Sequence, residues 1–269
     1  MRLLFLSDTH VGHGLPARPR SADPRRGAEF FESFEAALAP ARAGEVDAVL
    51  HAGDLLYRSR VPAWLSDAAL APLRAVADAG IPVLLLPGNH ERGRLPHPLL
   101  ALHRNLHVFD RPRTVVLEAG GVRVAFAGFP HARDIRARFG ELLAAATAGA
   151  PDADVTLLCL HHCVEGATCG PGNFTFRDGP DVIPRAALPR EVEAVLCGHV
   201  HRHQVLRAPG LPPIIYSGST ERTSFAEAGE TKGVVLLWLS TAGLERHEFR
   251  ALPEHSPPPR FRRGRPSAA

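Results

Sequence analysis

The sequence has 269 residues, of which 45% are hydrophobic and 22% charged, as in an ordinary globular protein long enough to form one large domain or two small ones. The formal net charge is +3, but residues 253–269 hold four arginines and one acid and account for all of it. Residues 1–252 are therefore formally neutral, which excludes global basic character as an argument for nucleic-acid binding, and no apolar run approaches the length of a membrane span.

Apolar runs typical of buried strands alternate along the chain with stretches of helical periodicity. The first run reaches Asp8 without a small-residue cleavage site and is too short for a signal peptide, so we expect a buried first strand. Residues 28–43 (AEFFESFEAALAPARA) and 64–80 (WLSDAALAPLRAVADAG) are predicted helices because their apolar side chains recur at helical spacing. The predicted strands are Leu3–Leu6, Val46–Leu50, Pro82–Leu86, Val122–Ala127, Val155–Leu160, Val192–Cys197, Ile214–Tyr216 and Val234–Leu239.

The order of these elements predicts an α/β fold. Strand, helix and strand in repetition favour a parallel sheet covered by helices. Residues 114–128 (TVVLEAGGVRVAFAG) instead predict a hairpin that turns at Gly120 and Gly121, which adds antiparallel pairing. We expect a mixed sheet, or two packed sheets flanked by helices, in one domain over residues 1–252.

Two compositional features concern the end of the chain and the cysteines. Residues 253–269 are rich in Pro and Arg and are predicted to be a disordered tail, which either is simply solvated or contacts phosphates without sequence preference. The four cysteines form no Cys-x2-Cys pair, which favours buried, reduced thiols over a zinc cluster and predicts a cytoplasmic location. They are Cys159, Cys163, Cys169 and Cys197.

Asp, Asn and His side chains follow five of the predicted strands, at the strand ends where function collects in α/β sheets. Oxygen and imidazole ligands without thiolates suit Mn, Fe or Zn. Seven ligands drawn from these residues would be too many for one catalytic metal with an open position, so the pattern favours two metals that share a bridging carboxylate. In chain order the polar residues are Asp8, His10, Asp54, Asn89, His90, His161, His162, His199 and His201.

The stretch LCGHVHRHQV places His199, His201 and His203 at alternate positions after the predicted strand Val192–Cys197. In an extended backbone, alternate residues point to the same side, so His199 and His201 could direct two imidazoles at one place. The alternative is an exposed strand end whose polar residues face water.

The ordered motifs DTH, GD, GNHE, LHH and GHVH resemble those of the calcineurin-like metallophosphoesterase superfamily, and the resemblance spans roughly residues 3–240. Within it, RRGAEFFESF and IIYSGSTERTSF are similar to the SbcD-type DNA repair nucleases, whose corresponding segment reads much like YSGSxERxxF. The resemblance implies a four-layer α/β/β/α sandwich and two divalent metal ions, with manganese expected first and iron or zinc as alternatives.

The resemblance also implies a role for each motif residue. The first metal would be held by Asp8, His10, Asp54 and His201, and the second by Asp54, Asn89, His161 and His199. Hydroxide between the two metals would attack phosphorus in line, and His90 would protonate the leaving oxygen as general acid. His162 and His203 would lie outside the ligand set. The implied activity is DNA phosphodiester hydrolysis, exonuclease or endonuclease, in repair or end processing. The alternatives are hydrolysis of a nucleotide or another small phosphoester and, without any broken ligand to support it, a catalytically inactive binding protein.

Four residues near these motifs are candidate substrate contacts: Arg58, Arg60, Arg92 and Tyr57. The arginines, with Arg94 and with Arg18, Arg20, Arg25 and Arg26 in the first loop, suit phosphodiester contacts or simply keep loops soluble. Tyr57 lies three residues beyond Asp54, where some members of the resembled family carry a histidine that is linked to exonuclease activity. This departure favours endonuclease or general phosphodiesterase activity.

The SbcD-type resemblance implies DNA as a partner, single-stranded or as duplex ends. These nucleases carry a capping domain and a partner-binding segment after the core, whereas this sequence ends soon after GVVLLWLSTAGLERHEFRALP. We therefore expect the cap to be missing or supplied by another chain, which leaves an SbcC-like ATPase partner in doubt. A homodimer through WLSDAALAPL is the further implication, with a buried helix face as its alternative.

Overall fold

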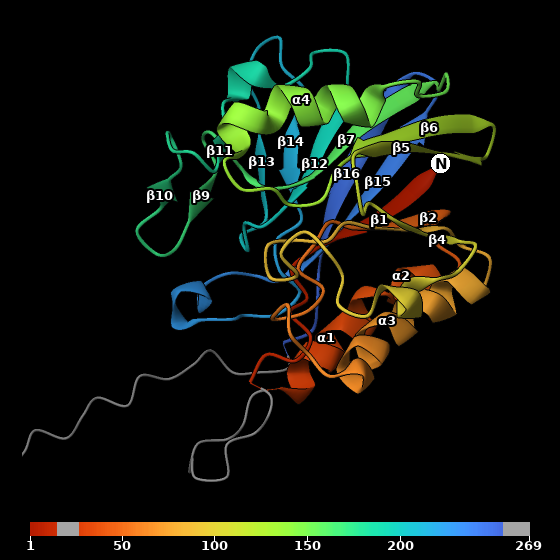
Figure 1. The fold of residues 1–269 in the computed structure, drawn as a ribbon, viewed down its shortest axis with the longest axis vertical. Helices are drawn as coiled ribbons and strands as arrows, with labels where there is room; N and C mark the ends of the chain where they lie inside the picture. The colour runs from red at the N-terminus through yellow and green to blue at the C-terminus, as the bar shows by residue number, and fades with distance from the viewer. Residues whose placement is uncertain (15–26, 255–269) are drawn as a thin grey trace, which may run out of the picture.

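A computed structural model describes residues 1–14 and 27–254 (Figure 1). The tail predicted at 253–269 lies outside these residues except for Pro253 and Glu254, and Arg18, Arg20, Arg25 and Arg26 lie outside them too.

The first six-stranded sheet has the strand order β16-β15-β1-β2-β3-β4. Strands β1 to β4 run parallel, whereas β15 pairs antiparallel with both β1 and β16. The strands are β1 (Arg2–Leu6), β2 (Ala48–His51), β3 (Val83–Leu85), β4 (Leu106–Val108), β15 (Gly233–Ser240) and β16 (Gly243–Ala251).

The second six-stranded sheet has the order β13-β14-β12-β7-β6-β5, in which the four central strands are parallel and the two edge strands antiparallel. Its strands are β5 (Arg113–Ala119), β6 (Val122–Gly128), β7 (Val155–His161), β12 (Ala194–Gly198), β13 (Gln204–Leu206) and β14 (Ile214–Tyr216). Two small ribbons pair β8 (Cys163–Val164) with β11 (Val182–Ile183) and β9 (Thr168–Cys169) with β10 (Phe174–Thr175).

Helices cover the outer face of each sheet and complete four layers (Figure 1). Helices α1 (Ala28–Ala37), α2 (Ala39–Arg42) and α3 (Ala63–Asp78) lie on the first sheet, and α4 (Ile135–Thr147) lies on the second. Residues 1–14 and 27–254 also contain three 3-10 turns, η1 (Pro98–Ala101), η2 (Arg185–Ala187) and η3 (Phe225–Glu227). No helix among the described residues is long and apolar enough to cross a bilayer.

Alternation along the strands separates three hydrophobic layers. In β1, Leu4 and Leu6 pack with the helices of the first sheet, while Leu3 and Phe5 pack between the two sheets. This is the period-two alternation of a strand that is buried on both faces. The third layer joins the second sheet to α4 through residues such as Phe139. The expectation of two packed sheets flanked by helices is confirmed, as is the hairpin at Gly120 and Gly121.

The structure corrects the prediction of one helix over residues 28–43. Two helices form, with the break at Leu38, because Pro40 has no N–H to continue the first helix, whereas a proline is tolerated in the first turn of the second. The helix predicted at 64–80 is present as α3.

Candidate metal centre

The five strands that were expected to carry polar residues all end at one place. Strands β1, β2 and β3 run parallel to one another in the first sheet, and β7 and β12 run parallel to each other in the second. Contacts between the sheets place these carboxyl ends at the same edge of the sandwich: Nδ1 of His161 bonds to the carbonyl oxygen of Ala52, and the N–H of His199 bonds to Asp8. The candidate site draws side chains from both sheets.

The backbone at this edge bends sharply. Asp8, His10, Asp54 and His199 all have positive φ angles, between 47° and 84°. Non-glycine residues rarely adopt this region, and each such residue costs on the order of 1 to 3 kcal/mol, so they persist only where the surroundings enforce them. Four of the seven predicted metal ligands are held in this costly conformation, which is typical of a functional site.

The extended conformation expected for His199 and His201 is wrong. Strand β12 ends at Gly198, and both histidines lie in bends after it, where His199 has a φ of 84°. The two imidazoles consequently reach different partners. Nδ1 of His199 lies 2.7 Å from Oδ1 of Asn89, whereas Nε2 of His201 lies 3.0 Å from Nε2 of His10.

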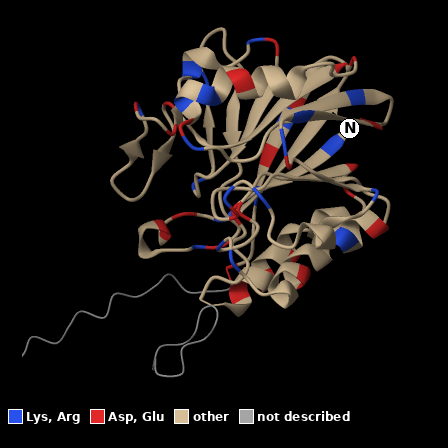
Figure 2. Ribbon diagram, viewed as in Figure 1, with Lys and Arg blue, Asp and Glu red and all other residues tan. Residues whose placement is uncertain are grey.

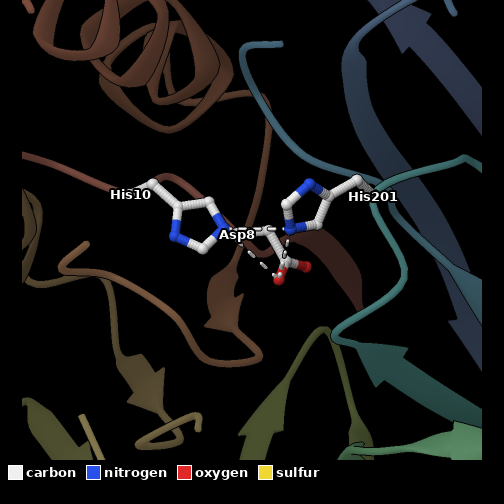
Figure 3. A group of neighbouring side chains, drawn as sticks. All are labelled: Asp8, His10 and His201. Atoms are coloured by element: carbon white, nitrogen blue, oxygen red, sulfur yellow. Dashed lines mark hydrogen bonds and ion pairs between the residues drawn. The ribbon is translucent and has the colours of Figure 1, made fainter. Parts of the chain in front are cut away.

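The first group of converging side chains is Asp8, His10 and His201 (Figure 3). Nε2 of His10 and Nε2 of His201 both face Oδ1 of Asp8, at 4.0 and 3.7 Å. Asp8 and His10 are fully buried. Ser7 donates a hydrogen bond of 2.5 Å to Oδ2 of Asp8, and the backbone N–H of His199 donates one of 3.0 Å. These bonds fix the carboxylate so that its Oδ1 faces the two rings.

The second group is built around Asp54, with His161 and His199. His161 donates its Nδ1–H to the carbonyl oxygen of Ala52, so its Nε2 is left to face Oδ2 of Asp54 at 3.3 Å and Oδ1 of Asn89 at 3.0 Å. Asp54 also faces Nε2 of His10 at 3.9 Å. Asp54 therefore lies between the two groups, where a shared ligand would have to lie.

These side chains fit divalent metals. The converging atoms are carboxylate and amide oxygens and imidazole nitrogens, without a thiolate, which is the donor set that Mn, Fe and Zn accept. Two imidazole Nε2 atoms 3.0 Å apart beside carboxylate oxygens form an arrangement that a cation between them would stabilise.

The charges of the cluster shift the acid–base properties of its members. Burial raises the pKa of Asp54, but the charge and hydrogen bond of His161 outweigh burial and hold that pKa far below its ordinary value. Burial lowers the pKa of His161, and Asp54 in turn raises it to about 9. For His199, burial and the charge of His161 lower the pKa to about 3.

His90 lies beside the first group without belonging to the predicted ligands. Its backbone N–H donates to Oδ1 of Asp54 at 2.9 Å, and its Nδ1 donates to the carbonyl oxygen of Tyr57. Its Nε2 lies 3.8 Å from Oδ2 of Asp54, and 32% of the side chain is exposed. The ring thus faces the centre from the solvent side. Tyr57 accompanies it, with ring centroids 5.5 Å apart.

The remaining predicted residues lie farther out. Arg58, Arg60 and Arg92 are exposed on the loops that carry Tyr57 and His90. Figure 2 shows basic and acidic residues interspersed over the ribbon. His162 is buried outside the groups, with its Nε2 against the backbone of Ala132. His203 stacks on Phe249 and donates Nδ1–H to the carbonyl of Tyr216, so it faces neither group.

Sequence reasoning missed two residues of this region. Glu91, in the GNHE motif, is buried and accepts hydrogen bonds from the N–H groups of Asp54, Leu56 and Gly88. It ties the loop after β2 to the loop after β3. Because Glu91 directly follows Asn89 and His90 in the sequence, it could have been predicted to lie near the candidate site. His131, after β6, stacks on His162 with centroids 4.9 Å apart and lies 6.0 Å from the ring of His199; a lone histidine after a hairpin gave no signal.

Comparisons with known proteins agree with this geometry. Residues 1–203 match the family model of the calcineurin-like phosphoesterases. The chain is 34% identical over 228 residues to the DNA double-strand break repair protein Mre11 of Haloferax volcanii, covering 84% of this chain and 47% of that protein. It is 26% identical over 272 residues to the SbcD component of the nuclease SbcCD of Bacillus subtilis, covering 88% of this chain and 66% of that protein.

Among solved structures, a dimetal phosphatase from Danio rerio shares the fold. The TM-score is 0.54 at 11% identity, covering 94% of this chain and 99% of that one. The chain spans about half the length of the Mre11 proteins from Haloferax volcanii and Methanopyrus kandleri that it matches.

Proposed function

The chain belongs to the calcineurin-like phosphoesterase family of metal-dependent hydrolases, and on that premise we propose that it hydrolyses phosphodiester bonds in DNA with two divalent metal ions, manganese first among them. The carrying observation is the convergence of seven candidate ligands from both sheets, four of them on strained backbone. A catalytically inactive relative would be expected to have lost part of such a costly arrangement.

The ligand set divides in the way that two metals would require. Asp8, His10 and His201 would hold the first ion, and Asn89, His161 and His199 the second, with Asp54 between them. When bound, such a metal pair lowers the pKa of water and neutralises phosphate charge.

His90 would supply the proton for the leaving oxygen. Because its Nδ1–H is held by the carbonyl of Tyr57, a proton on Nε2 is the one that can be transferred, and Nε2 faces the centre. The hydrogen bond from its backbone to Asp54 fixes the ring relative to the ligands. General acid catalysis of this kind contributes roughly 10²- to 10⁴-fold in rate.

DNA is the proposed substrate because the Haloferax volcanii and Bacillus subtilis relatives are named as a DNA repair protein and a nuclease. Tyr57 presents a half-buried ring next to His90, where it could stack against a base or sugar, and Arg58, Arg60 and Arg92 are exposed on the same loops for phosphate contacts. These contacts would hold the backbone while the metals act on one phosphate.

The test is a gel assay of the purified protein with Mn²⁺ on end-labelled linear duplex and on circular single-stranded DNA, with an Asp54→Ala control. We expect cleavage that depends on Asp54, and cutting of the circle would identify endonuclease activity. Asp54-dependent hydrolysis of a small phosphodiester with both DNAs intact would contradict the DNA proposal and support a nucleotide phosphodiesterase.

Two partners and a location complete the proposal. In WLSDAALAPL the side chains of Leu65, Leu70 and Leu73 are buried, as the alternative of a buried helix face requires, and Trp64 is 60% exposed. The exposed Trp64, with Leu99 and Leu102 around η1 at 76% and 74%, is what supports a homodimer. Light scattering should show a dimer that Leu99→Asp with Leu102→Asp converts to monomer.

An SbcC-like ATPase is proposed as the second partner from the similarity to the SbcD component of SbcCD. Four free cysteines, three of them buried, support a cytoplasmic location.

A further inference from the structure

We propose that Glu227 and Lys232 act together as positioning residues for His201, fixing both its ring and its backbone. The inference rests on the metal centre of the proposed function. It assigns a purpose to the segment that begins with IIYSGSTERTSF and continues through Lys232.

The ring of His201 is held from behind by Glu227. Oε1 of Glu227 lies 3.0 Å from Nδ1 of His201, which therefore donates its hydrogen. That bond selects the tautomer whose Nε2 carries a lone pair, and Nε2 is the atom that faces Asp8. Nδ1 of His10, by contrast, has no hydrogen-bond partner among the described residues. Of these two rings, His201 is the one held through a carboxylate.

The backbone of His201 is held by Lys232. Nζ of Lys232 donates to the carbonyl oxygen of His201 at 3.0 Å, and the N–H of Ser219 donates to the same oxygen at 3.0 Å. Because His201 lies in a bend between β12 and β13, pairing within either strand does not anchor it. Contacts from another segment must do so.

The two positioning residues also bind each other. Nζ of Lys232 lies 2.7 Å from Oε2 of Glu227, and both residues are buried, with 6% and 7% of their surface exposed. Thr223 and Ser224 donate their hydroxyl hydrogens to Oε1 of Glu227, at 2.6 and 3.2 Å. With the backbone N–H of Thr223, which donates to Oε2 at 3.3 Å, five donors surround this carboxylate. It has little freedom to turn, so the ring of His201 is held in a fixed orientation.

A second acid and a second base join the pair, and their charges balance each other. Glu230 lies 2.9 Å from Nζ of Lys232 and accepts a hydrogen bond of 3.0 Å from Nε of Arg202, next to His201 in the chain. Buried charges are costly unless paired, and here two acids meet two bases. These buried charges lie next to the imidazole of His201, on the side away from Asp8, which indicates that they orient that imidazole. Glu230 touches Lys232 without touching His201, so it provides a matched control.

The experiment measures Mn²⁺ affinity of the full chain by titration calorimetry without DNA. Loss of such an outer partner typically weakens metal binding 10- to 100-fold, and we expect this for Glu227→Gln, with less than threefold change for Glu230→Gln. Long-range proton–nitrogen NMR of the metal-free protein should show His201 losing its fixed tautomer in Glu227→Gln only. Circular dichroism checks that each variant is folded.

The double variant Glu227→Gln with Lys232→Met removes both charges together, which keeps the test open if the single variant does not fold. It should show the same 10- to 100-fold loss. Wild-type Mn²⁺ affinity in whichever of these variants folds would overturn the inference while leaving the proposed function intact. Failure of the wild-type protein to bind Mn²⁺ would overturn both.

Discussion

His90 combines three features that are not found together in any other histidine of the centre. Its ring is about one-third exposed, its Nδ1 is committed to a backbone carbonyl, and its backbone N–H binds the carboxylate of Asp54. The proposed acid gives up a proton in each turnover and needs this access to solvent, whereas four of the proposed ligands, Asp8, His10, Asp54 and His161, are buried.

The separation of roles can be measured. Replacing His90 by Gln keeps a polar side chain but removes the transferable proton, so we expect kcat to fall about 10²- to 10⁴-fold with Mn²⁺ affinity unchanged. Asp54→Ala should lose metal binding as well. Steady-state kinetics together with calorimetry distinguish the two variants, and near-normal turnover of His90→Gln would refute its role as the acid.

The side chains at the centre differ in how far the sequence reveals them. Asp8 and Asn89 follow recognisable strands, so their gathering at one edge could be predicted. The turn at His199 could not, because a positive φ in a histidine is imposed by contacts with distant segments, including the bond from its N–H to Asp8. Glu227 lies 26 residues beyond His201, and only the folded chain brings them together.

Among the strands, β12 ends at Gly198 so close to Ala52 and His161 that no side chain would fit at this position. A Cβ on Gly198 would lie 2.2 Å from the carbonyl oxygen of Ala52 and 2.8 Å from Nδ1 of His161. Those two atoms form the hydrogen bond that sets the tautomer of His161. The glycine at the end of this strand thus permits the two sheets to approach at the site.

Gly198→Ala should therefore force the two sheets apart at this point and lower the free energy of unfolding by about 1 to 3 kcal/mol, a range typical of overpacking. Gly140→Ala in the middle of α4 is the matched control, since nothing lies within 4 Å of the added methyl. The control should gain up to about 1 kcal/mol from helix propensity. Urea denaturation measures both, and equal effects would contradict the argument.

Strands buried on both faces could be predicted from their apolar runs, as β1 and β7 illustrate. Strand β16 could not. Its residues, GLERHEFRA, are mostly partly or fully exposed at the sheet edge, and their polarity resembles that of a loop. The α1 and α2 break was missed because Pro40 interrupts a continuous apolar periodicity.

For the whole molecule, the centre connects the two sheets because its candidate ligands come from both. Metal binding should stabilise the folded chain because the unfolded chain cannot gather ligands from both sheets. At a free Mn²⁺ concentration 100 times Kd, one site adds about 2.7 kcal/mol, which corresponds to a Tm increase of roughly 5 to 10 °C. Differential scanning calorimetry with and without EDTA checks this, and Asp54→Ala should abolish most of the shift.

The split of the ligands between the two sheets also sets the order in which the centre can be completed during synthesis. Asp8, His10, Asp54 and Asn89 leave the ribosome first, His161 and His199 follow, and His201 comes last. A nascent chain without the second sheet has only part of each metal site. The proposed nuclease therefore cannot complete its metal centre until the segment after β12, which carries His199 and His201, has been synthesised and has folded against the first sheet.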